Sequence, residues 1–410
     1  MSLAGEAVVA PAPEAAAPAR PRAGVPRANP LLVLIVTGMV VALGSLGFVS
    51  VAPNRIVSGK PLALWAAVEP GVAALVAALV VALGASALIR SGVWRDRLIA
   101  VLAGALLVAS LAAAAHAAGL VAAASGPVAR TSLGAAFWIV AAGAAFALAD
   151  AVGRLAPHPL AQSAIAAAVV GALLALAASG ALADLSLARE FANRRAAYGA
   201  EMLRHLALVG GALAAALPIG TGLGLLALRR PAWRKPLFAV LNLIQTIPSI
   251  AIFGLLIGPL SALSGAFPGL RAFGVGGIGA APAVIALTLY GLLPVARGAF
   301  TGLASVPPAV IDAARGMGLD ERQILRRVSI PLALPILVAA LRVVVVQLTG
   351  LAVVAALIGA GGLGVFIFQG LGQTATDLIL LGALSAIALA LVFDLVLRSL
   401  GALLATGERP

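Results

Sequence analysis

The sequence predicts an all-α membrane protein with about ten transmembrane helices, and three observations support this fold class. Hydrophobic residues make up 62% of the 410 residues, against roughly 45–50% in soluble domains. Apolar runs of about 20 residues, long enough to cross a hydrocarbon core about 30 Å thick, recur along the chain. No segment shows the alternating pattern of about ten residues that a membrane β-strand needs, which excludes a barrel.

The N-terminal region combines a polar tail with a first apolar run. Residues 1–30 are rich in Ala and Pro, and they predict a disordered cytoplasmic tail. The run Leu31–Val51 ends in a faint resemblance to a signal-peptidase site. Because a signal peptide's apolar region is usually only about 7–15 residues long, we expect Leu31–Val51 to be retained as a span.

The apolar runs fall into two groups separated by a charged stretch. Residues 31–182 form an N-terminal extension of about five spans, and residues 205–405 contain five more. Residues 183–204 are predicted to be a periplasmic connecting segment. The individual spans are predicted at Leu31–Val51, Leu62–Ile89, Leu98–Ala123, Leu133–Ala149, Leu160–Leu182, His205–Leu228, Pro236–Leu260, Ala280–Ala299, Leu334–Ile358 and Asp377–Leu400.

The distribution of basic residues predicts the orientation. With both termini in the cytoplasm, 18 of the 27 Lys and Arg residues fall at cytoplasmic positions, as the positive-inside tendency requires. Orientation therefore explains the net charge of +13 without a nucleic-acid partner. The chain contains no cysteine and three scattered histidines, so the sequence offers no disulfide and no metal site.

Residues 306–335 form a charged island between two very apolar segments, and we expect this loop in the cytoplasm. Pro308 suits the first turn of a helix, and Gly318 interrupts that helix. Asp320 caps a second short helix, with Gln323 completing a capping box, and Pro331 is expected to end it. The apolar stripe of the second helix consists of Ile324, Leu325 and Val328. Such a loop either rests on lipid headgroups or meets another protein.

The spacing within the island resembles the EAA loop of ABC importer permeases. Asp312-Ala313-Ala314 is followed after three residues by Gly318, and after nine more by Val328-Ser329-Ile330-Pro331. The family signature is Glu-Ala-Ala, three residues, Gly, nine residues and Ile-x-Leu-Pro. The resemblance implies that this loop docks on a cytoplasmic ATPase subunit. The implied coupling residues are Asp312, Ala313, Ala314, Gly318, Asp320, Glu321, Ile324, Leu325, Val328 and Pro331.

Segments outside the island narrow the resemblance to permeases for glycine betaine, carnitine and choline. Those segments are 245–249, 289–294 and 355–364, with sequences QTIPS, LYGLLP and AALIGAGGLG. The resemblance implies a five-helix type I ABC importer permease core and uptake of a quaternary-ammonium osmolyte. It also implies that this chain lies in the bacterial inner membrane and pairs with a second permease subunit, as a homo- or heterodimer. A periplasmic substrate-binding protein is a further implied partner. The resemblance does not extend to residues 1–182, an extension that only some family members carry.

The sequence indicates no nucleotide chemistry in this chain. It lacks a G-x-x-x-x-G-K-[ST] motif, so a separate ATPase would use the ATP, and we expect neither enzyme activity nor a directly bound cofactor. Two G-x-G-x-x-G patterns, at 274–279 and 359–364, border predicted spans. Because they lack the strand and the acidic residue of a dinucleotide site, they indicate tight turns.

Several polar residues fall inside predicted spans, where they are costly unless paired. Hydrogen bonding between helices is the favoured role, and Gln245 and Gln347 are the best candidates for the translocation path. The full set is Glu69, His116, Asn242, Gln245, Arg342, Gln347 and Asp394. Alternative functions are an ABC permease for another small solute such as an amino acid, an ion-coupled secondary transporter, and a membrane scaffold.

Overall fold

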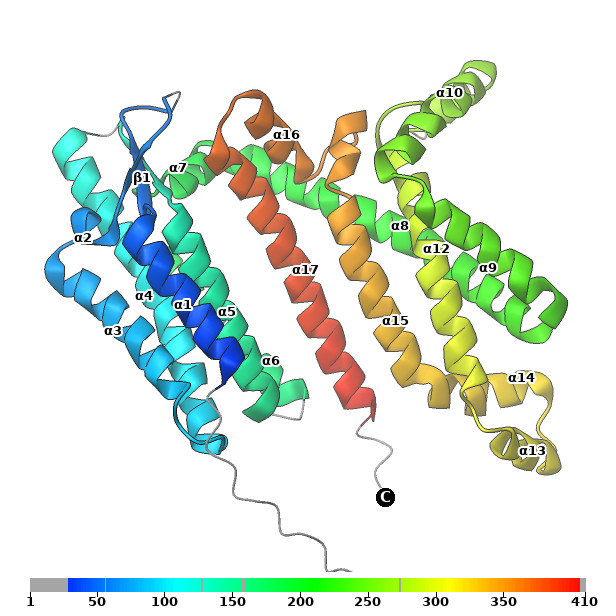
Figure 1. The fold of residues 1–410 in the computed structure, drawn as a ribbon. Helices are drawn as coiled ribbons and strands as arrows, with labels where there is room; N and C mark the ends of the chain where they lie inside the picture. The colour runs from blue at the N-terminus through cyan, green and yellow to red at the C-terminus, as the bar shows by residue number, and fades with distance from the viewer. Residues whose placement is uncertain (1–28, 56, 127, 156–158, 273, 406–410) are drawn as a thin grey trace, which may run out of the picture.

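The computed structural model describes residues 29–55, 57–126, 128–155, 159–272 and 274–405, which form a row of helices in two halves (Figure 1). Nearly all of the predicted tail, residues 1–30, lies outside the described residues. Helix α1 already begins at Pro30, where the Asn29 side chain accepts a hydrogen bond from the Leu32 amide at 3.3 Å. An Asn cap followed by Pro in the first turn is a strong start signal.

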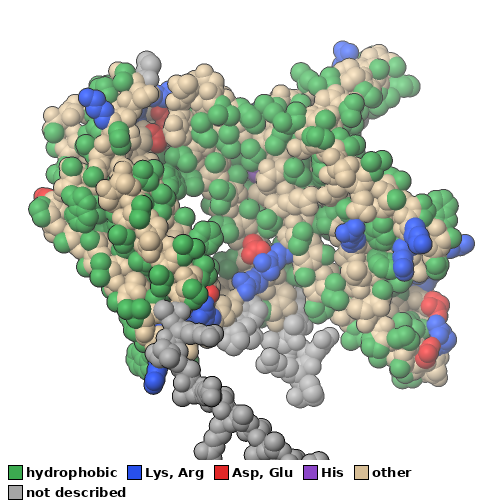
Figure 2. Space-filling model, viewed as in Figure 1, with side chains coloured by type: hydrophobic (Ala, Val, Ile, Leu, Met, Phe, Trp, Pro, Cys, Tyr) green, Lys and Arg blue, Asp and Glu red, His purple; other side chains and the backbone are tan. Residues whose placement is uncertain are grey.

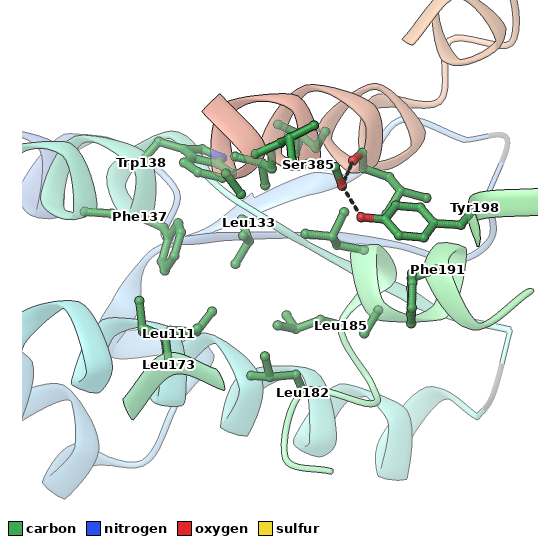
Figure 3. Close-up of a pocket in the computed structure, with 18 of the residues that line it drawn as sticks. Leu111, Leu133, Phe137, Trp138, Leu173, Leu182, Leu185, Phe191, Tyr198 and Ser385 are labelled. Atoms are coloured by element: carbon green, nitrogen blue, oxygen red, sulfur yellow. Dashed lines mark hydrogen bonds between the residues drawn. The ribbon is translucent and has the colours of Figure 1, made fainter. Parts of the chain in front are cut away.

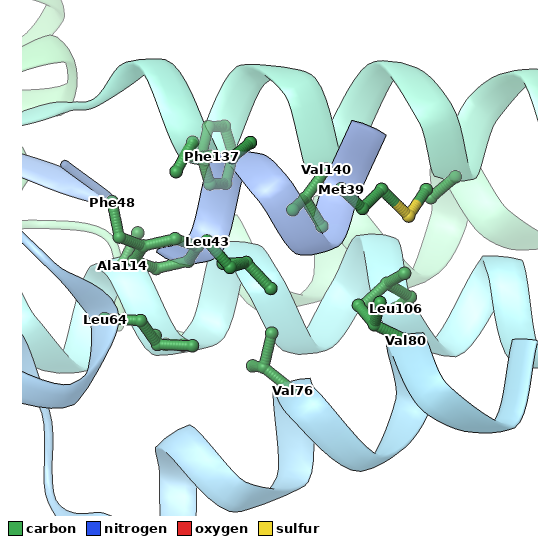
Figure 4. Packing of buried hydrophobic residues seen from close by; sticks show 14 of the residues in the cluster. Met39, Leu43, Phe48, Leu64, Val76, Val80, Leu106, Ala114, Phe137 and Val140 are labelled. Carbon is green, nitrogen blue, oxygen red and sulfur yellow. The ribbon is translucent and has the colours of Figure 1, made fainter. Parts of the chain in front are cut away.

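The N-terminal half is a helical bundle around one apolar core (Figure 4). Met39, Val76, Leu106 and Val140 meet there from four different helices, and each is buried. A Cβ on Gly143 would lie 2.5 Å from Met39 Cε, so a small residue allows this close approach. The helices are α1 (Pro30–Ser45), α2 (Leu64–Ala67), α3 (Pro70–Ser86), α4 (Val93–Ser125), α5 (Ala135–Leu155) and α6 (Pro159–Ala178).

A small antiparallel sheet covers one end of this bundle, and the sequence did not predict it. Its strands are β1 (Val49–Ala52), β2 (Lys60–Leu62) and β3 (Arg130–Leu133), in the order β2-β1-β3. The predicted span Leu31–Val51 therefore ends as a helix at Ser45, and its last residues form a strand. The β-branched residues Val49 and Val51 suit a strand, but four residues are too few to show its period.

The C-terminal half begins within the predicted connecting segment, because α7 and the start of α8 both fall inside residues 183–204. Helices α8 and α12 pack closely: a Cβ on Gly224 would lie 2.7 Å from Ala299 Cβ. The elements are α7 (Ser186–Asn193), α8 (Arg195–Arg229), α9 (Pro231–Thr246), α10 (Ser249–Ala266), α11 (Gly269–Ala272), α12 (Ala280–Ala304), α13 (Pro308–Gly316), α14 (Glu321–Ile324), the π-helical turn η1 (Leu325–Ser329), α15 (Ile330–Leu351), the 3₁₀ turn η2 (Val354–Ile358), α16 (Gly364–Gly372) and α17 (Thr376–Ala405).

The predicted span Pro236–Leu260 is wrong, because the chain breaks inside it between α9 and α10. Pro248 disfavours a helical conformation at the preceding residue, and Ile247 is extended, with φ −72° and ψ 129°. The freed Ile247 carbonyl accepts a hydrogen bond from the Tyr290 hydroxyl of α12. A side chain of the neighbouring helix α12 therefore supplies the hydrogen bond that the freed carbonyl needs, as the interior of a membrane requires.

The all-α membrane class is confirmed apart from the small sheet. Eight helices in the described part are long and apolar enough to cross a membrane, and α1 and α3 are shorter apolar helices of 16 and 17 residues. The total of about ten spans stays a prediction.

Candidate functional site

The charged island forms a separate projection at one end of the molecule (Figure 1). Helices α13 and α14 lie beyond the adjoining ends of α12 and α15. We call this end the loop end, and the opposite end, which carries the strands and α7, the sheet end. The first and last described helices, α1 and α17, also have their outer termini at the loop end.

A left-handed glycine turns the chain between α13 and α14. Gly318 has φ +83°, and the amides on either side of it close a Schellman motif. The Leu319 amide donates to the Ala314 carbonyl at 3.2 Å, and the Gly318 amide donates to the Arg315 carbonyl at 3.0 Å. Because a side chain is strained at this φ, the glycine is required by backbone geometry rather than by lack of space.

One arginine holds the two short helices together. Arg315 donates to the Asp312 carboxylate at 2.9 Å and to the Glu321 carboxylate at 2.8 Å. The hydrogen bond and charge of Glu321, supported by Asp312, raise the pKa of Arg315 above its ordinary value. All three side chains are mainly exposed, so the pairs orient the loop more than they stabilise the fold.

The predicted capping box is confirmed. Asp320 Oδ1 accepts from the Gln323 amide at 2.7 Å, and Gln323 Oε1 accepts from the Asp320 amide at 2.9 Å. The candidate coupling residues divide into two faces: Ala314 and Ile324 are buried with Leu325 and Val328 partly buried, whereas the exposed members are Asp312, Ala313, Gly318, Asp320, Glu321 and Pro331. The exposed face is therefore the part of the loop open to a partner.

The expectation that Pro331 ends the second helix is wrong. From Glu321 to Leu351 the chain is continuously helical, with the π-helical turn η1 joining α14 to α15. Pro331 lacks an N–H, and the wider π-helical turn that precedes it accommodates a residue that cannot donate to the turn before. The loop is thus connected to a long apolar helix without a flexible joint.

The two candidate path residues lie on different helices. Gln245, at the end of α9, donates to the Tyr290 carbonyl of α12 at 2.6 Å, which matches the interhelical role that the sequence favours for such residues. Gln347 on α15 is partly buried, and its side chain has no hydrogen-bond partner among the described residues. Arg342 and Asp394 form an ion pair between α15 and α17.

Sequence reasoning missed two residues of α8 that hold the second glycine pattern. The Gly362 amide donates to Glu201 Oε2 at 2.6 Å, and the Leu363 amide donates to His205 Nδ1 at 3.4 Å. With Nδ1 accepting, His205 Nε2 carries the proton and donates to the Thr349 carbonyl, 3.1 Å away. Gly362 has φ +88°, which confirms a tight turn. The i, i+4 spacing of an acid and a histidine at the start of a span was the available signal.

Two family models match separate parts of the chain. Residues 216–409 match the family described as "Binding-protein-dependent transport system inner membrane component". Residues 27–188 match the family described as "ABC transporter permease YehY, N-terminal domain".

Individual relatives match about half of the chain. Osmoprotectant import permease protein OsmW of Salmonella typhimurium is 42% identical over 197 residues, which are 48% of this chain and 86% of the relative. Glycine betaine/carnitine/choline transport system permease protein OpuCD of Bacillus subtilis is 36% identical over 199 residues, 48% of this chain and 80% of the relative. A chain of the inward-facing MetNI methionine ABC transporter aligns with a TM-score of 0.41 and 26% identity, covering 49% of this chain and 95% of that one.

Proposed function

Because the chain belongs to the family of binding-protein-dependent inner membrane components, the permeases of ABC importers, we propose that it passes glycine betaine or a related quaternary-ammonium osmolyte across the membrane. The relatives named for osmoprotectants, carnitine and choline support this substrate class. As a family member, it is a multi-pass protein of the inner membrane. A periplasmic binding protein would deliver the substrate, and aromatic residues of that protein would select the trimethylammonium group.

The observation that carries the proposed role as an ATP-driven permease is the shape of residues 308–331. The Schellman turn at Gly318, the capping box at Asp320 and the pairs of Arg315 keep a small charged surface in one orientation. A separate ATPase subunit would bind this surface through Asp312 and Ala313. Movement of the loop would pass through η1 into α15, because the helix is continuous there.

ATP would act through the ATPase, and this chain would bind no cofactor itself. Two ATPase subunits would draw together on a dimer of permease subunits and shift the path between inward- and outward-facing states. A shift from mostly one state to mostly the other requires about 5.5 kcal/mol of differential binding.

The orientation we propose places the loop end in the cytoplasm with both termini. Basic residues support it, since Arg154, Arg229 and Arg230 lie at helix ends together with four arginines of the loop itself.

Reconstituted uptake tests the function. Proteoliposomes containing the full chain together with an ATPase and a binding protein of this transporter family should accumulate radiolabelled glycine betaine only when ATP is enclosed with the ATPase. Accumulation driven by a sodium or proton gradient without ATP would replace the proposal with secondary transport.

Cross-linking tests the docking surface, because the chain has no cysteine of its own. Ala313→Cys, on the exposed face of α13, should cross-link to a cysteine in the ATPase cleft. Ser91→Cys is the matched control, since it is exposed at the α3–α4 connection of the same end. Cross-linking at Ser91 instead would place the ATPase on the N-terminal half.

A further inference from the structure

An apolar cavity of about 730 Å³, open on part of its surface, lies between the two halves of the chain (Figure 3). Leu111 and Phe137 line it from the N-terminal half, and Leu185 and Phe191 line it from the segment before α8. Residues 380–392 of α17 close the opposite side. The space-filling view shows the surface hollowed between the N-terminal half and the rest of the molecule (Figure 2).

Polar contacts fasten the two halves on both sides of this cavity. At the sheet end, Arg55 pairs with Glu190 at 3.0 Å, and Ser132 Oγ donates to Asp377 at 2.6 Å. At the loop end, two side chains of α17 bond to two of α6: Arg398 to Gln162, and Ser399 to Ser163. These contacts join the two halves at both ends of the cavity.

Water is a poor occupant of this cavity. Its two hydroxyl groups already bond to each other, since the Tyr198 hydroxyl donates to Ser385 Oγ at 2.9 Å, and Ser385 donates onward to the Leu381 carbonyl. The remaining walls are almost entirely hydrocarbon, and apolar cavities without free polar partners stay dry.

The size and the walls of the cavity favour hydrocarbon chains. The cavity has nearly five times the roughly 150 Å³ that accommodates benzene. Most of the lining residues lie on apolar helices long enough to cross a membrane, α4, α5, α6, α8 and α17, and only 6% of the apolar stretch of α6 is buried. Thin acyl chains of the surrounding bilayer fit such a space.

We propose that this cavity is a phospholipid site, in which an acyl chain of a bilayer lipid fills the space between α5, α6 and α17 and joins the N-terminal half to the permease core. The inference is independent of the transported substrate. It assigns lipid a structural role between the two regions of the chain that match separate families.

Tryptophan fluorescence can test the site because Trp138 lines the cavity. The other tryptophans, Trp65, Trp94 and Trp233, are more than half exposed and can be replaced by Phe. The full chain with Trp138 alone is placed in nanodiscs of phosphatidylcholine with or without bromine on its acyl chains. Brominated chains should quench Trp138 at least twofold more in this protein than in one whose cavity is filled.

Ala141→Phe on α5 and Ala388→Phe on α17 fill the cavity from opposite walls. Ala142→Phe is the matched control, because Ala142 is exposed on the same helix and does not line the cavity. Native mass spectrometry of the detergent-purified protein should find a phospholipid retained by the wild type and by the control, and lost from either filled variant.

Three results would overturn the proposal. Equal quenching in the wild type, both filled variants and the control would mean that only lipid around the protein reaches Trp138. Absence of quenching throughout, or retention of a stoichiometric small polypeptide in place of lipid, would mean that protein occupies the space.

Discussion

Gly318 is the position at which the geometry of the coupling loop can be separated from its chemistry. Its φ of +83° closes the turn between α13 and α14, and a Cβ there would meet no atom within 4 Å. Gly318→Ala therefore adds backbone strain of about 1–2 kcal/mol and no collision. That strain lowers the population of the observed turn by a factor of roughly 5–30 relative to its alternatives.

Two further variants complete the design. Gly318→Leu adds bulk on the exposed face to the same strain. Gly316→Leu adds bulk alone, because Gly316 is the last residue of α13, has no positive φ, and also has open space around it. The assay titrates the ATPase against permease in nanodiscs and measures substrate taken up per ATP hydrolysed.

We expect Gly318→Ala to weaken ATPase binding by up to about tenfold, which corresponds to 1.4 kcal/mol. Gly318→Leu should weaken it further and lower uptake per ATP, with unchanged membrane content. Gly316→Leu should bind within about twofold of the wild type. Equal behaviour of Gly318→Ala and the wild type would refute the argument that the left-handed turn sets the docking surface.

Four other residues give three predictions of different kinds. Glu201→Ala leaves the Gly362 amide without its acceptor, so we expect a loss of about 1–3 kcal/mol in unfolding free energy, seen as a lower melting temperature in detergent. Removing either Arg342 or Asp394 alone should destabilise the α15–α17 pair more than replacing both with Leu, and a double-mutant cycle measures the difference. Thr374 has φ +50°, unfavourable for a β-branched residue, so Thr374→Gly should raise stability by about 1 kcal/mol, and a lower melting temperature would contradict that reasoning.

The sequence predicted best where local chemistry suffices. The cap at Asp320 acts within three residues, and the turn glycines need only their own backbone conformation. It predicted least well where the outcome depends on a neighbour. Pro248 breaks a span where the Tyr290 hydroxyl donates a hydrogen bond to the freed Ile247 carbonyl, whereas Pro331 does not break one because a π-turn makes room for it.

By itself, the sequence determined that this is a multi-pass helical membrane protein with a charged loop at Asp312–Pro331. Spans can be read locally because lipid requires each helix to satisfy its own backbone hydrogen bonds. Only the tertiary structure decided which polar side chains pair, which face of the loop is exposed, and where the halves leave a cavity. Those features join residues as far apart as Ser163 and Ser399, and no local period encodes such a distance.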